Sequence, residues 1–403
     1  MGQSSRKQTT GIFKNAQWKN YINYAVIIVF LIVMIILSSA GILNRSMYST
    51  LTRIAFSMIL AVSLNLVVGF LGELSLGHAG FMCVGAYIGC YIANLLRAGG
   101  GLPEILVLII SMIVAGIVAA IFGFIIGLPA LRLKGDYLAI ATLAFGEIVR
   151  NVFMNLDTFG GAQGLSTDLY DKKTLYIIAF VVLLIVLFFC QNLINSKHGR
   201  AVVAIRDNEI AAKAMGINVT FYKLLIFIVA AFFAGLAGVL YGGVTGVIRQ
   251  EAFSYNYSIE ILVMVVLGGM ASINGSLIAA AVITYINVTL QSQLSGALAP
   301  VKSIVYALIL IVIVIFGNAP GLKKIRENFR NMFKSKKVRP ERIKQDEGNW
   351  DRIETKIKMD EVLSADARTN YADAPVEAGA EAVAEEVSDV PFIVPDADTK
   401  GGK

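Results

Sequence analysis

Charged residues are scarce in this 403-residue sequence, and the shortage excludes most classes of soluble protein. Asp, Glu, Lys and Arg make up 16% of the chain, whereas soluble domains carry about 25%. Residues 1–322 hold 19 Lys and Arg and 11 Asp and Glu, while the last 81 residues hold 16 and 17. This distribution excludes an ordinary soluble enzyme, a disordered chain and a disulfide-stapled secreted domain. A polytopic membrane protein with a charged tail remains.

Cysteine and histidine are also rare, and neither forms a metal-binding or catalytic pattern. Cys83, Cys90 and Cys190 lie in apolar runs without CxxC or CxxxH spacing, which indicates small buried residues. No HExxH, GxSxG or Cys/His cluster occurs, and the GxxxxGK[ST] phosphate loop is missing. We therefore expect no enzyme activity, catalytic residue, metal or cofactor in this chain. If ATP drives the protein, a partner subunit binds the ATP and Mg²⁺.

Long apolar runs predict an all-α, polytopic transmembrane helix bundle over residues 22–322. A span needs about 20 apolar residues at a rise of about 1.5 Å each. About ten candidates occur, at 22–43, 54–71, 79–96, 104–128, 137–156, 174–194, 219–243, 258–274, 277–294 and 302–318. No convincing cleavage site follows the first run, so it indicates a transmembrane helix and not a signal peptide.

Basic residues between the spans indicate their orientation, because cytoplasmic loops collect Lys and Arg. With the N-terminus inside, the basic loops near 132 and 197–213 and the segment after the last span all face the cytoplasm. The opposite loop, 157–173, has three Asp against two Lys. We therefore expect a multi-pass protein of the cell membrane, with segment 1–21 and the C-terminus cytoplasmic. Arg45 and Arg53 fall on the outer side and are an exception.

Two glycine-rich segments, 69–80 and 267–276, interrupt the apolar runs. Broken backbone at membrane depth is tolerated only where it is buried in protein or lines a cavity. Paired breaks in the two halves of a chain therefore indicate a transport pathway. The alternative, tight loops between short helices, stays open. The candidate pathway residues here are Gly72, Ser75, Gly77, His78, Gly268 and Gly269.

Glu147 and Arg150 are further pathway candidates, one turn apart on the same face of the fifth predicted span. A charge at the bilayer centre costs at least about 2.5–3.5 kcal/mol, so we expect the pair to face the bundle or a wet cavity. A substrate contact, a proton relay, a mutually satisfied structural pair and an Arg150 that snorkels to the outer side remain alternatives.

Small residues recur at helical spacing in two spans. The four-residue interval holds for Ala234, Gly238, Gly242 and Gly246, and for Gly85 and Gly89. Such stripes let another helix approach closely. We therefore expect all six positions to pack helices together.

The segment near 206–216 has the features of a short docking helix. Asp207 or Asn208 can cap a helix from Glu209 to Met215, and Gly216 suits the position after its end. A helix of about two turns is not stable alone in water, so we expect it to dock on something. Its Ala-rich surface, ringed by charged residues, suits a partner's groove; a surface helix lying on its own bundle is the alternative.

Several ordered stretches resemble the LivM-type permease subunit of ABC importers for branched-chain amino acids. The matching stretches lie between about 54 and 322, at 69–80, 131–140, 145–150, 160–164, 205–212, 233–238 and 258–260. The family commonly has Gly-Pro where this chain has Gly275-Ser276, a departure at the start of the ninth predicted span.

The resemblance implies a ten-helix fold similar to vitamin-B12-type importer permeases. It implies a LivH-like second permease, two ABC ATPase subunits, an extracytoplasmic amino-acid-binding protein and the lipid membrane as partners, without nucleic acid. The segment 206–216 resembles the coupling helix on which the ATPases act. The implied coupling residues are Arg206, Asp207, Asn208, Glu209, Ala212, Met215 and Gly216.

The implied function is one permease half of an ATP-driven importer of Leu, Ile or Val. A permease for urea or short amides is an alternative, since such permeases look alike. A self-sufficient ion-coupled carrier that uses Glu147 and Arg150 is another, and a non-transporting membrane scaffold is disfavoured by the paired breaks.

The last 81 residues fall outside the resemblance. Residues 323–344 carry ten cationic and two acidic side chains, which is typical of a juxtamembrane segment that binds anionic lipid at about 1 kcal/mol per residue. Residues 345–403 carry 15 acidic and six basic residues and are predicted to be a disordered cytoplasmic tail. Residues 389–396 form either a short partner-docking peptide or part of that solvated tail.

Overall fold

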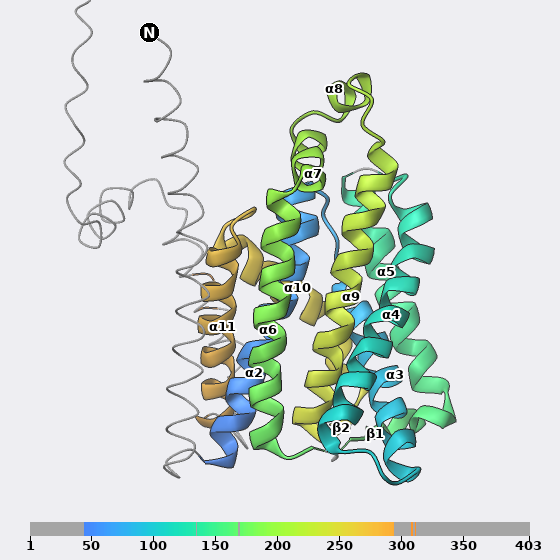
Figure 1. Ribbon diagram of the computed structural model, residues 1–403, viewed down its shortest axis with the longest axis vertical. Coiled ribbons are helices and arrows are strands. Elements are labelled where there is room, and N and C mark those ends of the chain that lie inside the picture. Colours follow the sequence, from blue (N-terminus) through green and yellow to red (C-terminus); the bar gives the residue numbers. More distant parts are fainter. Residues whose placement is uncertain (1–43, 134, 168–169, 294–307, 309–310, 312–403) are drawn as a thin grey trace, which may run out of the picture. The chain divides into compact units, whose positions relative to one another are not determined.

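The computed structural model describes residues 44–133, 135–167, 170–293, 308 and 311, which form a helical bundle (Figure 1). Seven helical segments in this part of the chain are long and apolar enough to cross a membrane. They are α2 (Arg45–Asn65) with its π-helical continuation η1 (Leu66–Leu71), α3 (His78–Ala98), α4 (Glu104–Ala130), α5 (Asp136–Asn155), α6 (Lys172–Asn195), α9 (Val219–Thr245) and α11 (Ile273–Gln293). A shorter apolar helix, α10 (Tyr255–Gly268), precedes α11.

The predicted spans match these helices, with three corrections. The second helix begins at Arg45 and not at 54, which places Arg53 inside a helix. The eighth ends at Gly268 and not at 274, because Gly269 has a positive φ of 94° that a helix cannot accommodate. The ninth begins at Ile273 and not at 277. The predicted spans 22–43 and 302–318 (residues 308 and 311 apart), and segments 1–21, 323–344 and 345–403, lie outside the described residues.

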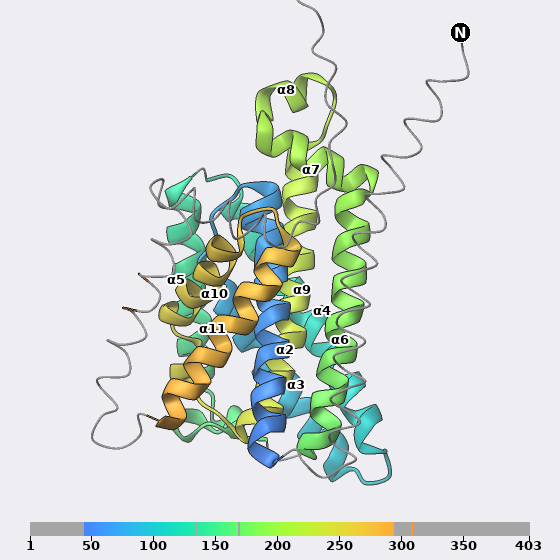
Figure 2. The same cartoon turned by 90° about the vertical axis from the view of Figure 1, so that its left-hand side faces the viewer.

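Short elements close the two ends of the bundle (Figures 1 and 2). At one end α6 leads through α7 (Lys197–Asp207) and α8 (Glu209–Ala214) into α9, and α8 lies beyond the ends of the neighbouring helices. At the opposite end β1 (Leu165–Ser166) pairs antiparallel with β2 (Val247–Ile248). The strands share their loops with the 3₁₀ turns η2 (Asp157–Phe159), η3 (Gly161–Gln163) and η4 (Gln250–Phe253). We call these the α8 end and the strand end.

Glycines let α3, α4 and α9 pack backbone to backbone. A Cβ added at Gly85 of α3 would collide with the backbone of Gly235 in α9, and one at Gly238 would collide with the backbone of α3. Gly89 and Gly242 are similarly crowded, and Ala234 is fully buried. Gly246 is a correction to the predicted stripe: it lies just after α9 with φ +75 and open space around it, so it serves a turn.

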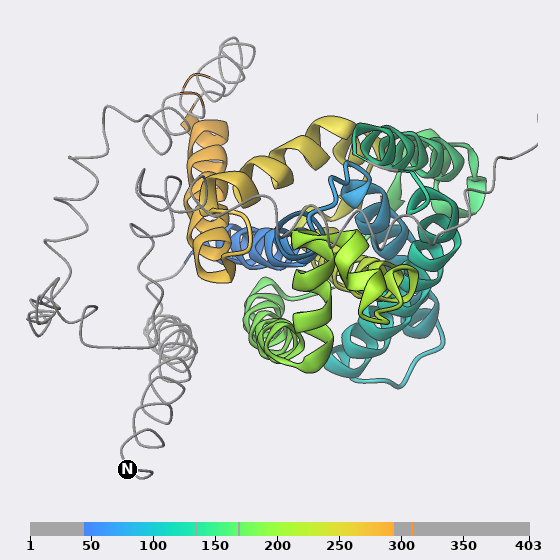
Figure 3. The same cartoon turned by 90° about the horizontal axis from the view of Figure 1, so that it is seen from above.

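Helix α2 occupies the centre of the described bundle. It contacts α6, α9, α10 and α11, and Figure 3 shows it between α11 on one side and α6 and α9 on the other. Within its apolar stretch 83% of the residues are buried, against 33% for α5 and 28% for α11. The residues that follow α2 are therefore embedded in protein, while much of α5 and α11 is uncovered.

Candidate functional site

The two glycine-rich breaks have different geometries. After η1, Gly72 adopts a left-handed conformation (φ +80) and the chain runs without helix from residue 72 to 77, before α3 begins at His78. Between α10 and α11 only residues 269–272 are non-helical, with positive φ at Gly269 and Ala271. The first break is therefore an irregular connection, exposed at Gly72 and buried at Ser75 and Gly77, whereas the second has the form of a tight turn.

Asn65, the last residue of α2, bonds this helix to the second break. Its side chain is fully buried, and its Nδ2 donates to the carbonyl of Ser272 (3.1 Å) and to Oγ of Ser276 (2.8 Å). Its Oδ1 accepts from the backbone N–H of Ala271 (3.0 Å), which is 206 positions later in the chain. Gly69 lies one turn after Asn65, and an added Cβ there would collide with both Asn65 and Ala271. One amide thus fixes the end of α2 to the second break, and Gly69 of the first glycine-rich segment packs against both.

Sequence reasoning missed Asn65, although a signal was present. An amide inside the apolar run 54–71 must find hydrogen-bond partners within the protein, because lipid supplies none. That signal identifies a buried polar contact, but it does not identify the partner segment.

Hydroxyl groups from three helices hold the connection before α3. The bonds run from Ser63 Oγ to His78 Nε2 (2.8 Å), from the Leu76 N–H to Thr142 Oγ1 (3.0 Å) and from the Ala79 N–H to Ser258 Oγ (3.1 Å). They come from α2, α5 and α10 in turn. Gly77 and His78 are therefore placed by packing and hydrogen bonds on all sides.

Ser75 differs from its neighbours in this connection. Its side chain is buried, and its hydroxyl has no hydrogen-bond partner among the described residues. Gly77, two residues later, lies so close to the Thr142 carbonyl of α5 that a Cβ would collide with it. The connection is thus closely packed against α5.

Glu147 and Arg150 form an ion pair (2.7 Å) on α5, and both side chains are about one-quarter exposed. The second Glu147 oxygen accepts the backbone N–H of Tyr255 (3.0 Å), the first residue of α10. A carboxylate at a helix N-terminus is favoured by the free N–H groups and by the helix dipole. The structure therefore places this pair against the start of α10, with both Glu147 oxygens bonded and the buried Arg150 Nε without a hydrogen-bond partner among the described residues.

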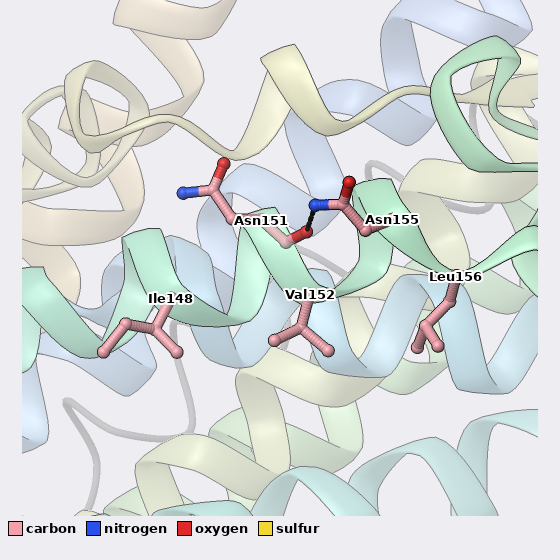
Figure 4. A pocket seen from close by; sticks show the side chains of 5 residues that line it. All are labelled: Ile148, Asn151, Val152, Asn155 and Leu156. Carbon is pink, nitrogen blue, oxygen red and sulfur yellow. Dashed lines mark hydrogen bonds between the residues drawn. The ribbon is translucent and has the colours of Figure 1, made fainter.

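A shallow, open hollow lies on the outer face of α5. Its lining residues are Ile148, Asn151, Val152, Asn155 and Leu156, and its volume is about 470 Å³. Figure 4 shows the three apolar side chains in one row and the two amides in another. The Asn155 amide donates to the Asn151 carbonyl (2.8 Å), and the Asn151 amide donates to the Glu147 carbonyl.

This uncovered face is unusual because α5 is the least apolar of the seven candidate spans. Ile148 and Val152 are exposed beside the two amides. Polar side chains face lipid rarely, since hydrocarbon offers them no partners. The face therefore has the composition of a protein contact or a wet pathway and not of a lipid contact.

Helix α8 matches the predicted docking helix in its limits and its cap. The Asn208 Oδ1 accepts the Ala211 N–H (3.0 Å) and caps the helix, and Gly216 follows its end with φ +81. Arg206 and Asp207 are a correction, because they form the last turn of α7 and not part of the docking helix. Ala212 is buried against the bundle.

The outer side of α8 is apolar and exposed. Ile210 and Met215 are each 82% exposed, and Figure 1 shows α8 projecting beyond the rest of the bundle. Ile210 was not among the predicted coupling residues. Its position two residues after the cap, on a short helix of which only Ala212 is buried, is the signal that could have found it.

An ion network connects α8 to the first break. Nζ of Lys223, in α9, contacts Glu73 (2.5 Å) and Glu209 (3.2 Å), and Lys213 contacts Glu209 on its other oxygen (3.0 Å). The hydrogen bond from Lys213 lowers the pKa of Glu209, with a further lowering by Lys223 that burial partly opposes. Glu209 therefore stays ionised at neutral pH and holds both cations.

Arg206 makes a second connection to the same break. Its Nη1 donates to the Gly69 carbonyl (3.2 Å), and its Nε and Nη2 donate to Asp207 (3.1 and 2.9 Å). Its aliphatic stem lies so close to Gly72 that a Cβ on Gly72 would be about 2.7 Å from Arg206 Cγ. Arg206 was expected to ring the docking helix; it extends instead toward the break.

The comparisons with known proteins agree with the resemblance found in the sequence. The family described as "Branched-chain amino acid transport system / permease component" matches residues 46–314. The chain is 34% identical over 280 residues to the high-affinity branched-chain amino acid transport system permease protein LivM of Escherichia coli (strain K12), a match that covers 60% of this chain and 64% of that protein.

Two further relatives extend this similarity. The probable branched-chain amino acid transport permease protein LivM of Methanocaldococcus jannaschii is 30% identical, over 56% of this chain and 68% of that protein. The permease protein LivH of Escherichia coli (strain K12) is 22% identical, over 67% of this chain and 92% of that protein. The chain spans less than two thirds of the length of the enterobacterial LivM proteins that it matches.

Proposed function

The chain belongs to the permease-component family of branched-chain amino acid transport systems, and on this premise we propose that it is one permease subunit of an ATP-driven importer of Leu, Ile and Val. It is a multi-pass membrane protein. The observation that carries the proposal is the exposed apolar tip of α8, joined by ion pairs to the broken segment after α2.

The tip of α8 is the proposed docking surface for two ABC ATPase subunits, which supply ATP and Mg²⁺ sites. Ile210 and Met215 project into water, and burying a side chain of this size in a partner's groove contributes about 1.5–3 kcal/mol. Residues 206–216 would then be the coupling segment, with Asn208 and Gly216 holding the helix ends and Ala212 fixing it to the bundle. This assignment makes the α8 end cytoplasmic, and together with the predicted spans 22–43 and 302–318 it would make both termini cytoplasmic.

The uncovered face of α5 is the proposed contact with a LivH-like second permease. A partner permease would cover the exposed Ile148 and Val152 and leave the two amides beside the translocation pathway between the subunits. The breaks at Gly72, Ser75, Gly77, His78, Gly268 and Gly269 would border this pathway, and Glu147 and Arg150 would orient α10. An extracytoplasmic amino-acid-binding protein would deliver the substrate at the strand end.

The ion-coupled carrier is the second candidate, and the geometry disfavours it. A proton relay needs a carboxylate that is free to gain and lose a proton. Both oxygens of Glu147 instead contact groups of this chain, Arg150 and the first N–H of α10.

The test is copurification from mild detergent, followed by identification of the bound chains and measurement of ATPase activity and uptake in liposomes. We expect a second permease and P-loop ATPases, and ATP-dependent uptake of Leu, Ile and Val over urea and short amides. Ile210→Ser with Met215→Ser should lose the ATPases, whereas the control Ile113→Ser with Ile117→Ser, on the exposed face of α4, should retain them. Uptake by the chain alone without ATP would contradict the proposal.

A further inference from the structure

Lys223 is a buried charged residue that binds carboxylates from two different segments. Its side chain is 6% exposed, and its partners are Glu73 (14% exposed) and Glu209 (26% exposed). Breaking a buried ion pair by removing one partner is costly, because the remaining charge stays buried without compensation. Segments held by such a group therefore separate less readily than segments held by a surface pair.

The two carboxylates that bind Lys223 each lie at a boundary between structural elements. Glu209 is the first residue of α8, and Glu73 follows the left-handed Gly72 at the start of the non-helical connection. The backbone N–H of Glu73 donates to the Val67 carbonyl (3.1 Å), so the residue is also fixed to the end of η1. Lys223 thus joins the tip of the bundle to the residue where the first break begins.

The neighbouring ion pair provides an internal contrast. Lys213 also binds Glu209, at 3.0 Å, but its side chain is 60% exposed and both partners belong to α8. Exposed pairs at this spacing contribute little to stability. The Lys213 pair therefore connects α8 only to itself.

We propose that Lys223 is a positioning residue that transmits a displacement of α8 to the connection 72–77 through Glu73, and so couples docking of a partner to movement of the broken segment. The inference rests on the proposed function, because the displacement is attributed to ATPase subunits. The Arg206–Gly69 bond runs in parallel from α7 to the same break, and it does not replace the buried charge.

The experiment uses the assembled complex in liposomes and measures substrate taken up per ATP hydrolysed. Lys223→Met should lower this ratio about tenfold, the size expected for a coupling free energy between two sites, while the ATPases still copurify. The matched control Lys213→Met should change the ratio less than about twofold. Lys223→Arg, which keeps the charge, should recover most of the coupling.

A ratio for Lys223→Met equal to that of Lys213→Met, with the complex intact, would overturn the inference. If Lys223→Met fails to assemble, Glu73→Gln decides, since it keeps the side-chain shape and removes only the charge that faces Lys223. A lowered ratio supports the link, and an unchanged ratio overturns it. Wild-type complexes without ATP-dependent uptake would contradict the proposed function itself, before any variant is compared.

Discussion

Different kinds of polar contact stabilise the strand end and the α8 end of the bundle. At the strand end, Lys172 donates to the carbonyls of Gly243 and Val244 (2.9 and 3.0 Å) at the end of α9. Thr167 donates to two more carbonyls, those of Gly242 and Gly246. At the α8 end, the main contacts join one charged side chain to another.

This difference indicates which end of the bundle is rigid and which end can move. The bonds from Lys172 reach two carbonyls in the last turn of α9, where backbone carbonyls lack an intrahelical N–H partner, and so they hold one backbone geometry. The buried ion pairs of Lys223 keep α8 and the first break together when either segment moves, because separating the charges would leave one of them buried without compensation. We infer that the strand end anchors α9 and that the α8 end carries the moving parts.

Substitution of Asn65 should have the largest effect on stability. Its amide bonds the end of α2 to the backbone between α10 and α11. Asn65→Leu leaves the Ala271 N–H without its partner, at about 1–3 kcal/mol, and removes one hydrogen bond each from the Ser272 carbonyl and the Ser276 hydroxyl, which stay bonded to each other. We therefore expect a loss of about 2–4 kcal/mol in the free energy of unfolding, measured by thermal or denaturant unfolding in detergent. The control is Asn151→Leu, whose amide contacts only its own helix. Equal losses in the two variants would show that Asn65 is no clamp.

Lys172 should have the next largest effect and tests the anchor. Lys172→Met removes hydrogen bonds from a charged donor to two helix-terminal carbonyls, which costs about 1.5–3 kcal/mol. The exposed neighbour Lys173 is the matched control, and Lys173→Met should change stability by less than about 0.5 kcal/mol. The measurement is again the unfolding midpoint. A variant that keeps its stability but loses ATPase binding would reverse the roles assigned to the two ends.

The exposed tip of α8 should show the opposite behaviour. Ile210→Ser with Met215→Ser removes side chains that contact little of the bundle, so we expect a change in stability within about 0.5 kcal/mol. Binding of ATPase subunits, measured by copurification, should be lost. Stability and binding that fall together would mean that these side chains pack against the chain itself.

The smallest effect is the pH response of the α8 end. The pKa of Glu209 is lowered, chiefly by the hydrogen bond from Lys213. A lowered folded-state pKa gives a stabilisation that is complete above the unfolded value of about 4.3 and is lost as the pH falls further. Hydrogen exchange of residues 206–216, corrected for its intrinsic rate, should be constant from pH 6 to 8 and rise only in acid. A rise near pH 6, or one that persists in Glu209→Gln, would contradict this assignment.

The order and type of the main helices follow from the sequence, because apolar runs of about 20 residues have few alternatives in a membrane protein. The same holds for the cap of α8, since Asn208 and Gly216 act on their own neighbours. The pairing of Glu147 with Arg150 is also local, one helical turn apart. The exact helix ends did not follow from the sequence. The structure ends α10 at Gly268, six residues before the predicted end, and begins α11 at Ile273, four residues before the predicted start.

Tertiary structure alone decided what the polar residues inside these runs contact. Asn65 and Ala271 are 206 positions apart, and Glu73 and Lys223 are 150 apart, so no local pattern specifies either contact. Gly246 shares the spacing of the packing stripe but falls just past the end of α9, where it makes a turn. The sequence by itself determined a helical membrane bundle with two breaks and a capped tip. Only folding decided that one amide joins α2 to the second break and one buried lysine joins the tip to the first break, because those contacts depend on which distant segments the packed helices bring together.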